Sequence, residues 1–298
     1  MKKIHLFIIL IAVSSTIAFA QNKDTKKADD LYNRLAYTDA AVAYQKLLKK
    51  GKGNRYVYEQ LANSYYFIND SKKAETFYKR VVKGKKVKPE TIYSYAQALK
   101  ANGKYVDYNT WMKKFAEMKP TDSRSVAFMK NPNYLPKYLE NAKKFSLTNM
   151  KEINTEYSEF GGTVMDKYFY FSSARNTARK NYTWNEEPFL DIYVASVLTD
   201  GTYMEAELIE GDVNTKYHEG SVTFSQDGKR MYFSRESFFE NEFEKDSISN
   251  TKFSVLHLYQ ATLDGDTWRQ VEPLHINSPN FSVSNPALSA DGKPITPP

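Results

Sequence analysis

The sequence predicts a multidomain α + β protein, in which a helical N-terminal half is followed by a half of antiparallel strands. Residues of matching size recur every 34 positions between Ala28 and Pro120, and 34 residues is the length of a helix–turn–helix repeat. From about Lys144 this pattern is replaced by short alternating or β-branched runs separated by Asp-Gly pairs. The length of 298 residues is enough for two domains of ordinary size.

Residues 1–20 have the pattern of a secretory signal peptide. A short basic head precedes Ile4–Val13, which is almost wholly apolar, and Ala18-Phe19-Ala20 matches a small-x-small cleavage site. The apolar run is shorter than the ~20 residues that span a bilayer, which argues against a membrane anchor. The chain has no cysteine, which excludes disulfides, thiolate metal sites, a cysteine nucleophile and attachment through a lipidated cysteine. We expect an exported protein that starts at Gln21.

Residues 21–120 are expected to form about three helical hairpins. Two helices that cross closely need small side chains at the crossing and larger ones around it. Four rows of residues keep the 34-residue spacing in register: Ala28, Ala62 and Ala96; Ala40, Ala74 and Tyr108; Tyr44, Tyr78 and Met112; and Leu47, Val81 and Phe115. Asp24 and Lys27 stand where apolar residues are expected, so the first helix should be degenerate or frayed.

These rows resemble the tetratricopeptide repeat (TPR) family over roughly residues 24–120, although Tyr108 replaces a small residue. The resemblance implies a stack of hairpins whose concave face holds peptides or partner helices. The candidates for partner-binding aromatic residues are Tyr58, Tyr65, Tyr66, Tyr93 and Tyr95. We expect most of these tyrosines to be packing residues.

A stack of repeats needs a cap at its end. Residues 121–143 are therefore expected to contain a capping helix and a linker. The candidate helix is Asn133–Lys144, because four apolar side chains there lie at helical spacing: Tyr134, Leu135, Tyr138 and Leu139.

Residues 144–298 are expected to form antiparallel hairpins. The predicted strands are Lys144–Met150, Gly162–Met165, Tyr168–Ser172, Asp191–Val197, Ser221–Phe224, Arg230–Ser234 and Val255–Thr262. Asp-Gly adopts the positive-φ conformation of a tight turn at little cost. Such pairs stand at Asp200-Gly201, Asp227-Gly228, Asp264-Gly265 and Asp291-Gly292.

This half also repeats, because Ser225–Lys229 recurs at Ser289–Lys293, 64 residues later. The unit resembles the four-stranded, WD40-like blade of TolB-type (PD40) β-propellers, which implies two blades and the opening strand of a third. Closed propellers have about 4–8 blades, and Pro294–Pro298 cannot supply the next strand. We therefore expect the sequence to be a portion of a longer protein. A short product with an open sheet edge is the alternative.

Charge divides the chain at the same boundary. Residues 21–150 contain 27 Lys and Arg against 12 Asp and Glu, and residues 151–298 contain 13 against 23. The helical half therefore carries a net +15 and the strand half −10. Solvated helix faces, an acidic partner, and attraction between the halves all agree with this pattern. Nucleic acid is not an expected partner of an exported protein.

No catalytic, cofactor-binding or metal-binding residues are predicted. The four histidines lack metal-ligand spacing, and nucleophile-elbow, phosphate-loop and dinucleotide motifs are absent from the sequence. Glu186, Glu187 and Asp191 form an acidic cluster near Trp184, which is more typical of a solvated loop than of a glycosidase pair. The run Thr262–Trp268 resembles the Asp-box of sialidases but is one residue short, and Asp264 and Asp266 are too few for a calcium site.

TPR-like repeats followed by WD40-like blades behind a signal peptide resemble the N-terminal part of OmpA-family envelope proteins of the PorE type, which are linked to type IX secretion. The resemblance implies a non-catalytic, periplasmic scaffold that is associated with the outer membrane and binds other envelope proteins through the TPR groove and the propeller face. Peptidoglycan would be reached only through a domain that this sequence does not show. The alternative is a propeller-containing hydrolase of glycans or peptides whose catalytic part is missing or unrecognised.

Overall fold

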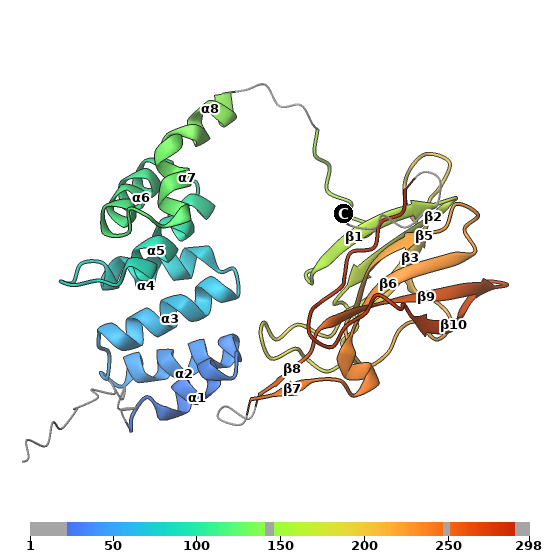
Figure 1. Ribbon diagram of the computed structural model, residues 1–298, viewed down its shortest axis with the longest axis horizontal. Coiled ribbons are helices and arrows are strands. Elements are labelled where there is room, and N and C mark those ends of the chain that lie inside the picture. Colours follow the sequence, from blue (N-terminus) through green and yellow to red (C-terminus); the bar gives the residue numbers. More distant parts are fainter. Residues whose placement is uncertain (1–22, 141–145, 247–250, 290–298) are drawn as a thin grey trace, which may run out of the picture.

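The computed structural model describes residues 23–140, 146–246 and 251–289. A stack of helices is followed by antiparallel sheets, and the two halves lie beside each other (Figure 1). The predicted α + β class is therefore confirmed. The predicted signal peptide, together with Asp291 and Gly292, lies outside the described residues. Within the described ranges, no helix combines the length and the apolar character that crossing a membrane requires.

The helical half is a TPR-like stack of three hairpins with two further helices. Its elements are α1 (Lys26–Asn33), α2 (Tyr37–Lys49), α3 (Arg55–Phe67), α4 (Ser71–Val81), α5 (Pro89–Ala101), α6 (Tyr105–Met118), α7 (Ser123–Lys130) and α8 (Tyr134–Glu140). The second helices of the hairpins begin at intervals of 34 residues, at Tyr37, Ser71 and Tyr105. The short α1 agrees with a degenerate first helix.

Local signals set where these helices begin. The side chains of Asn54, Asp70 and Asp122 accept hydrogen bonds from backbone N–H groups in the first turns of α3, α4 and α7. Pro89 occupies the first turn of α5, where its missing N–H has no helical partner to lose.

The repeat rows form the core of the helical half. The alanines of the first two rows are at most 2% exposed: Ala28, Ala40, Ala62, Ala74 and Ala96. Tyr108, which replaces a small residue in the second row, is also buried, at 4% exposure. The larger side chain is accommodated because Phe128 of α7 packs edge-on against its ring, at 6.0 Å between centroids.

The cap begins earlier than the sequence predicted. Helix α7 covers α6, and its Phe128 is buried in the helical core. In α8, Tyr134 and Leu135 pack partly against that core, whereas Tyr138 and Leu139 are 68% and 61% exposed. The capping role therefore belongs mainly to α7. In the described part of the predicted helix, Tyr134 and Leu135 contribute to this packing.

Two four-stranded sheets with the same strand order form the second half. The first contains β1 (Glu159–Met165), β2 (Tyr168–Ser173), β3 (Asp191–Ser196) and β4 (Glu207–Leu208); the second contains β5 (Glu219–Phe224), β6 (Arg230–Glu236), β9 (Leu256–Asp264) and β10 (Thr267–Pro273). Between β6 and β9 the chain forms the short 3₁₀ helix η1 (Ser237–Glu240) and a small hairpin of β7 (Glu244–Lys245) and β8 (Lys252–Phe253). All pairings are antiparallel.

The described strands do not close into a propeller. Strand β1 packs against β5, so the two sheets face each other along their first strands. The strand predicted at Lys144–Met150 is not formed in its described part, residues 146–150. β4 and β10, for which the sequence analysis names no residue range, complete the two sheets as the fourth strands that the four-stranded unit requires.

Equivalent hydrogen bonds join successive units. The Asn214 side chain accepts from the backbone N–H of Ile192 and donates to its carbonyl, and Asn277 does the same with Leu258. The backbone N–H of Ser221 donates to Ser172 Oγ, and that of Asn285 donates to Ser234 Oγ. Residues 274–289 therefore bind to the second sheet in the same way as the segment that contains Asn214 and Ser221 binds to the first sheet.

Candidate interaction surfaces

Alternate helices of the stack are linked by polar side chains along one face. Tyr56 of α3 donates to Asp29 of α1 (2.9 Å), Thr91 of α5 donates to Glu59 of α3 (2.5 Å), and Arg124 of α7 donates to both carboxylate oxygens of Glu90 of α5 (2.8 Å each). The Arg124 hydrogen bonds also lower the pKa of Glu90. The first helices of the hairpins therefore share one continuous face, which is the concave face expected of a TPR-like stack.

The five predicted tyrosines divide between the core and this face. Tyr65 and Tyr95 are packing residues, at 6% and 5% exposure, and Tyr58 stacks against Phe77. Tyr66 and Tyr93 are half-buried on the neighbouring helices α3 and α5. Burial raises the pKa of Tyr66, and the nearby Tyr93 raises it further. Tyr66 packs edge-on against Tyr78, whereas the ring of Tyr93 packs against Phe115.

Arg124 was not predicted as part of this surface. Its guanidinium lies 4.4 Å from the ring centroid of Tyr93 and 4.8 Å from that of Phe115. The repeat spacing could have identified Arg124, because it follows Glu90 by 34 residues and so occupies the same position in the next unit.

Trp184, in the loop between β2 and β3, contacts the helical half. Its indole Nε1–H donates to the backbone carbonyl of Phe67 (2.9 Å), and its ring lies edge-on to Tyr37 at 4.8 Å between centroids. Tyr37 and Phe67 stack on each other at 4.7 Å. Backbone bonds across the loop hold its shape, including Tyr182 N–H to the Glu187 carbonyl (2.7 Å). An aromatic contact therefore connects the two halves.

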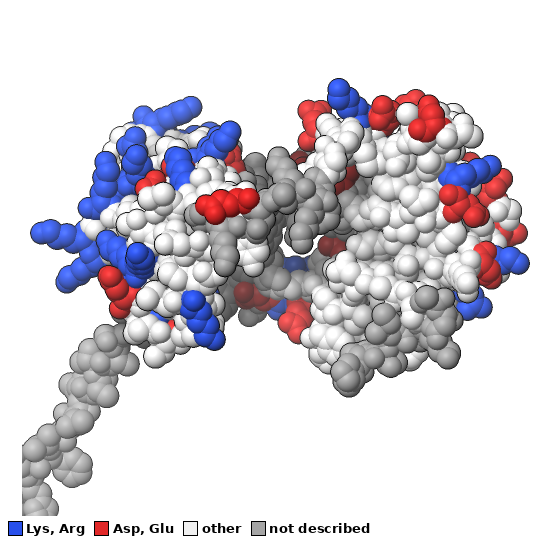
Figure 2. Space-filling view, turned by 90° about the horizontal axis from the view of Figure 1, so that it is seen from above, with Lys and Arg blue, Asp and Glu red and all other residues white. Residues whose placement is uncertain are grey.

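Charge is unevenly placed on the helical half. Figure 2 shows Lys and Arg side chains gathered on the side that faces away from the sheets, whereas Asp and Glu are more frequent on the outer surface of the sheet half. The excess of basic residues is therefore largely exposed to solvent in this view.

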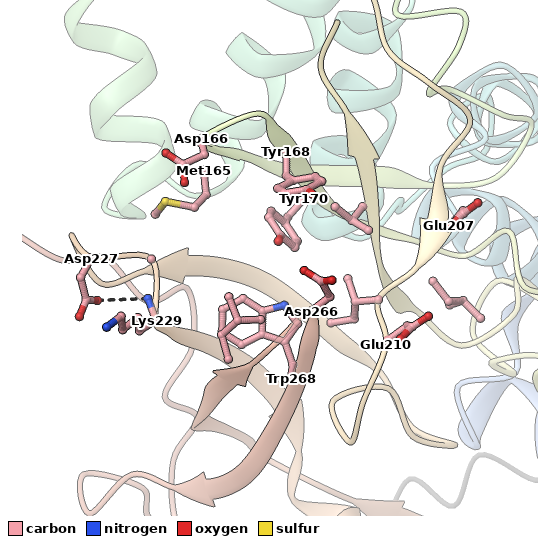
Figure 3. A pocket seen from close by; sticks show the side chains of 15 residues that line it. Met165, Asp166, Tyr168, Tyr170, Glu207, Glu210, Asp227, Lys229, Asp266 and Trp268 are labelled. Carbon is pink, nitrogen blue, oxygen red and sulfur yellow. Dashed lines mark hydrogen bonds between the residues drawn. The ribbon is translucent and has the colours of Figure 1, made fainter.

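A cavity of about 420 Å³ lies between the two sheets, at their turn-bearing end (Figure 3). Its apolar walls include Tyr168, Tyr170 and Trp268. Its lining also includes five acidic residues, namely Asp166, Glu207, Glu210, Asp227 and Asp266, and one basic residue, Lys229. Sequence reasoning examined Asp266 and Trp268 as part of an Asp-box look-alike but did not place them in a cavity.

The segment after β4 is attached to β10 beside this cavity. The backbone N–H of Trp268 donates to the backbone carbonyl of Glu210, and the backbone N–H of Asp212 donates to the backbone carbonyl of Trp268 (2.9 Å each). Gly211 has φ of 119°, and a Cβ at this position would lie 1.9 Å from the Trp268 carbonyl oxygen. This close approach requires glycine, so the connection between the sheets is sterically defined.

The acidic cluster of the sequence analysis does not form a catalytic pair. Asp191 is fully buried and accepts hydrogen bonds from Arg179 (2.7 Å) and Asn176 (2.7 Å). Glu187 accepts instead from Asn185 within the loop, and Glu186 has φ of 62° in the same turn. The carboxylate of Asp191 therefore has a structural role.

Titratable groups with displaced pKa values occur where β5 meets the preceding sheet. Burial raises the pKa values of Glu219 and Glu236 to about 7 and lowers that of His218 to about 4. Glu219 pairs with Arg235 at 2.9 Å, and both side chains are fully buried. His218 Nδ1 accepts from the backbone N–H of Leu190 (3.0 Å). The Glu219–Arg235 pair joins the neighbouring strands β5 and β6, and the His218 bond joins the start of β5 to the residue before β3.

Glu240, Glu242 and His257 could together offer ligands to a metal ion. However, His257 Nδ1 already lies 2.7 Å from Glu240 Oε2, and its Nε2 lies 3.2 Å from the Ser278 carbonyl oxygen. Asp191, at the corresponding place of the first sheet, holds an ion pair with Arg179. Both ring nitrogens of His257 are therefore already used in contacts within the protein. Sequence spacing missed the cluster because its members come from two separate segments, residues 240–242 and β9.

No family model and no curated protein match the sequence. Among solved structures, the first TPR of Spaghetti (RPAP3), bound to an HSP90 peptide, aligns with 14% identity and a TM-score of 0.33, over 37% of this chain and 87% of that one. The C-terminal part of a TPR repeat-containing protein from Cytophaga hutchinsonii aligns with 19% identity and a TM-score of 0.33, over 43% of this chain and 53% of that one. The chain thus spans about half the length of the second structure.

Proposed function

We propose that the protein is a non-catalytic scaffold for protein–protein interactions in the cell envelope. The observation that carries this proposal is the shared face of the first helices, which presents the half-buried Tyr66 and Tyr93 and on which Arg124 covers the Tyr93 ring. Half-buried aromatic rings beside an arginine are the side chains that most often dominate binding energy at protein interfaces.

The proposal extends to location and assembly. The protein is exported to the periplasm and associates with the outer membrane, as its first twenty residues suggest. The two four-stranded sheets act as blades of a WD40-like propeller, supported by their common strand order and by the start of a third unit at residues 274–289. Its partners are other envelope proteins, in an assembly such as type IX secretion.

Site-specific photocrosslinking in the native cells tests this proposal. A photoreactive phenylalanine analogue at Tyr66 or Tyr93 should give the same discrete adduct, and it should be recovered from the envelope fraction. Val106 of α6, which is 81% exposed, is the matched control position and should not give that adduct. Equal adducts at Val106, or none at Tyr66 and Tyr93, would contradict a binding role for this face.

An immunoblot of fractionated cells with antibody against residues 21–150 tests the location separately. A band in the periplasmic or outer-membrane fraction is expected, and release into the medium would contradict it. The hydrolase alternative has no specific support, because the described acidic cluster at Glu186, Glu187 and Asp191 does not form a catalytic pair.

A further inference from the structure

A cluster of three aromatic side chains on the first helices of the stack contacts the sheet half. This aromatic cluster consists of Tyr32, Tyr37 and Phe67, whose ring centroids lie between 4.7 and 6.4 Å apart. Trp184 lies edge-on to two of these rings, at 4.8 Å from Tyr37 and 6.4 Å from Phe67. We propose that the aromatic cluster is part of the partner-binding face, and that Trp184 occupies it until a tryptophan of a partner protein takes its place.

The aromatic cluster is continuous with the shared face of the first helices. Tyr66, which lies on that face, packs edge-on against Phe67 at 5.8 Å between centroids. Tyr32 belongs to α1 and Phe67 to α3, so two of the three members come from helices that form the face. A partner segment that binds along this face can therefore reach the position of Trp184.

The position of Trp184 offers both an apolar contact and a hydrogen-bond acceptor. Phe67 is the last residue of α3, and the last carbonyl groups of a helix have no partner within that helix. The Trp184 Nε1–H donates to this carbonyl at 2.9 Å. Phe67 remains 37% exposed beside Trp184, so part of it is open to a ligand. Tryptophan suits the position best, because its large ring also carries an N–H donor.

The loop that carries Trp184 is held by the sheet half. At its base, Asn181 forms an antiparallel bridge with Pro188. The Phe189 ring packs against His218, which lies at the start of the second sheet, at 4.3 Å between centroids. Trp184 can therefore leave the aromatic cluster while its loop keeps the same shape. The contacts that it loses are one hydrogen bond and two ring contacts.

The charges favour an acidic partner segment. Residues 21–150 contain 27 Lys and Arg against 12 Asp and Glu, so an acidic segment is attracted to the helical half. The internal occupant has the same character, because Glu186 and Glu187 follow Trp184 closely in its loop. We therefore expect the partner segment to present a tryptophan next to carboxylates.

Occupation by Trp184 lowers the affinity for such a partner. Two rings cannot fill the same place, so the partner binds only those molecules in which Trp184 has left the aromatic cluster. Removal of the Trp184 side chain should therefore strengthen partner binding. If Trp184 contacted the partner directly, its removal would weaken binding instead.

This inference rests on the proposed function for the existence of a partner, but its first test uses the purified full chain alone. The probe is a head-to-tail cyclic peptide with the sequence of residues 180–189. Cyclisation imitates the loop, in which the backbone N–H of Phe189 donates to the Lys180 carbonyl (2.9 Å). By isothermal titration, Trp184→Ala should bind the peptide with a Kd on the order of 1 mM or tighter. The wild type should bind it about tenfold more weakly, because its own Trp184 competes.

Control peptides and variants locate the binding. A cyclic peptide with alanine in place of tryptophan should not bind, and one with glutamine in place of both glutamates should bind about threefold more weakly at low ionic strength. In the Trp184→Ala chain, the further change Phe67→Leu should weaken binding by about fivefold, because it removes one ring of the aromatic cluster. Phe160→Leu is the matched control, at a phenylalanine of β1 that is 46% exposed, and it should leave the Kd within about twofold.

Photocrosslinking in cells tests the replacement by a partner. The yield of the adduct at Tyr66 should rise about threefold or more when Trp184→Ala is introduced, because every molecule then has a vacant aromatic cluster. An unchanged or lower yield would show that the partner does not use the aromatic cluster.

The peptide measurements can overturn the proposal independently. Equal affinity of the wild type and Trp184→Ala, or no binding to either, would exclude Trp184 as a replaceable occupant. Equal binding of the alanine peptide would exclude recognition of tryptophan, and equal binding of the glutamine peptide would exclude an acidic segment. Peptide binding without any adduct at Tyr66 or Tyr93 would contradict the proposed face and its partner, so the two proposals can be distinguished.

Discussion

His218 shows how one residue joins two units of the sheet half. Its Nδ1 accepts the backbone N–H of Leu190, and its ring packs against Phe189 at 4.3 Å between centroids. In the next unit the hydroxyl of Ser282 accepts the N–H of Leu256 (3.1 Å) in the same way. Both units therefore use a hydrogen-bond acceptor at this position, and a protonated imidazole would lose the Nδ1 lone pair that accepts the bond.

Protonation of His218 should destabilise the fold in mildly acidic solution. Burial lowers its pKa from 6.5 to about 4 in the folded chain, so the unfolded chain binds more protons between these pH values. The free energy of unfolding should therefore fall as pH falls from 6.5 to 4, by up to about 3 kcal/mol from this group.

Urea denaturation of the wild type and of His218→Asn, each at pH 7 and pH 5, measures this contribution. The amide oxygen of the variant can still accept from Leu190, and the variant does not titrate, so it should lose about 2 kcal/mol less than the wild type between these pH values. Comparison of the two proteins is needed because the raised pKa values of Glu219 and Glu236 act in the opposite direction. The same pH dependence in both proteins would show that His218 is not responsible.

At the scale of elements, the turn inside each helical hairpin uses a left-handed residue at the same repeat position. Leu35, Asn69 and Gly103 have φ values of 61°, 61° and 74°. Glycine and asparagine adopt this conformation readily, whereas leucine does so at a cost of about 1–2 kcal/mol. The first hairpin therefore contains local strain that the second and third do not.

Leu35→Asn should stabilise the protein by about 0.5–1 kcal/mol, because it relieves this strain. The side chain of Leu35 lies outside the core cluster of the helical half, so little packing is lost. The reverse change, Asn69→Leu, should destabilise the second hairpin by about 1 kcal/mol. Thermal and urea unfolding check both values. A loss of stability in Leu35→Asn would show that the Leu35 side chain matters more for packing than its backbone conformation does.

At the scale of the whole molecule, Trp184 connects the two halves. One hydrogen bond and two aromatic contacts connect it with Phe67 and Tyr37. Tyr66 packs edge-on against Phe67 at 5.8 Å, so the Trp184 contact lies next to the proposed partner-binding face. Contacts of this size contribute about 1–3 kcal/mol together, so a single substitution can shift the arrangement of the halves.

Trp184→Ala should separate the halves in part and increase the radius of gyration measured by small-angle X-ray scattering. Trp184→Phe keeps an aromatic ring but removes the bond to the Phe67 carbonyl, so its radius should lie between those of the wild type and Trp184→Ala. Tyr138→Ala, at an aromatic residue that is 68% exposed, is the control and should leave the radius unchanged. An unchanged radius in Trp184→Ala would mean that other contacts hold the halves together.

Much of the fold could be predicted because its signals are periodic and local. The start positions of α2, α4 and α6 follow the 34-residue spacing, and hairpin turns follow Asp-Gly pairs at Gly228 and Gly265. The repeat spacing does not tell which of two adjacent tyrosines is buried, because the side chains of neighbouring helix residues point about 100° apart. Tyr65 is therefore in the core and Tyr66 is on the shared face. Residue type does not distinguish them, because both are tyrosines.

The sequence by itself determined the two halves, the repeat length, and the division of charge between them, because each depends on residue types at regular spacing. The tertiary structure alone decided which residues from distant segments meet. Trp184 reaches Phe67 across 117 positions, and the aromatic cavity joins turns of two separate sheets. Such contacts depend on how whole elements pack in space. Periodicity along the chain predicts the elements but not which of them pack together.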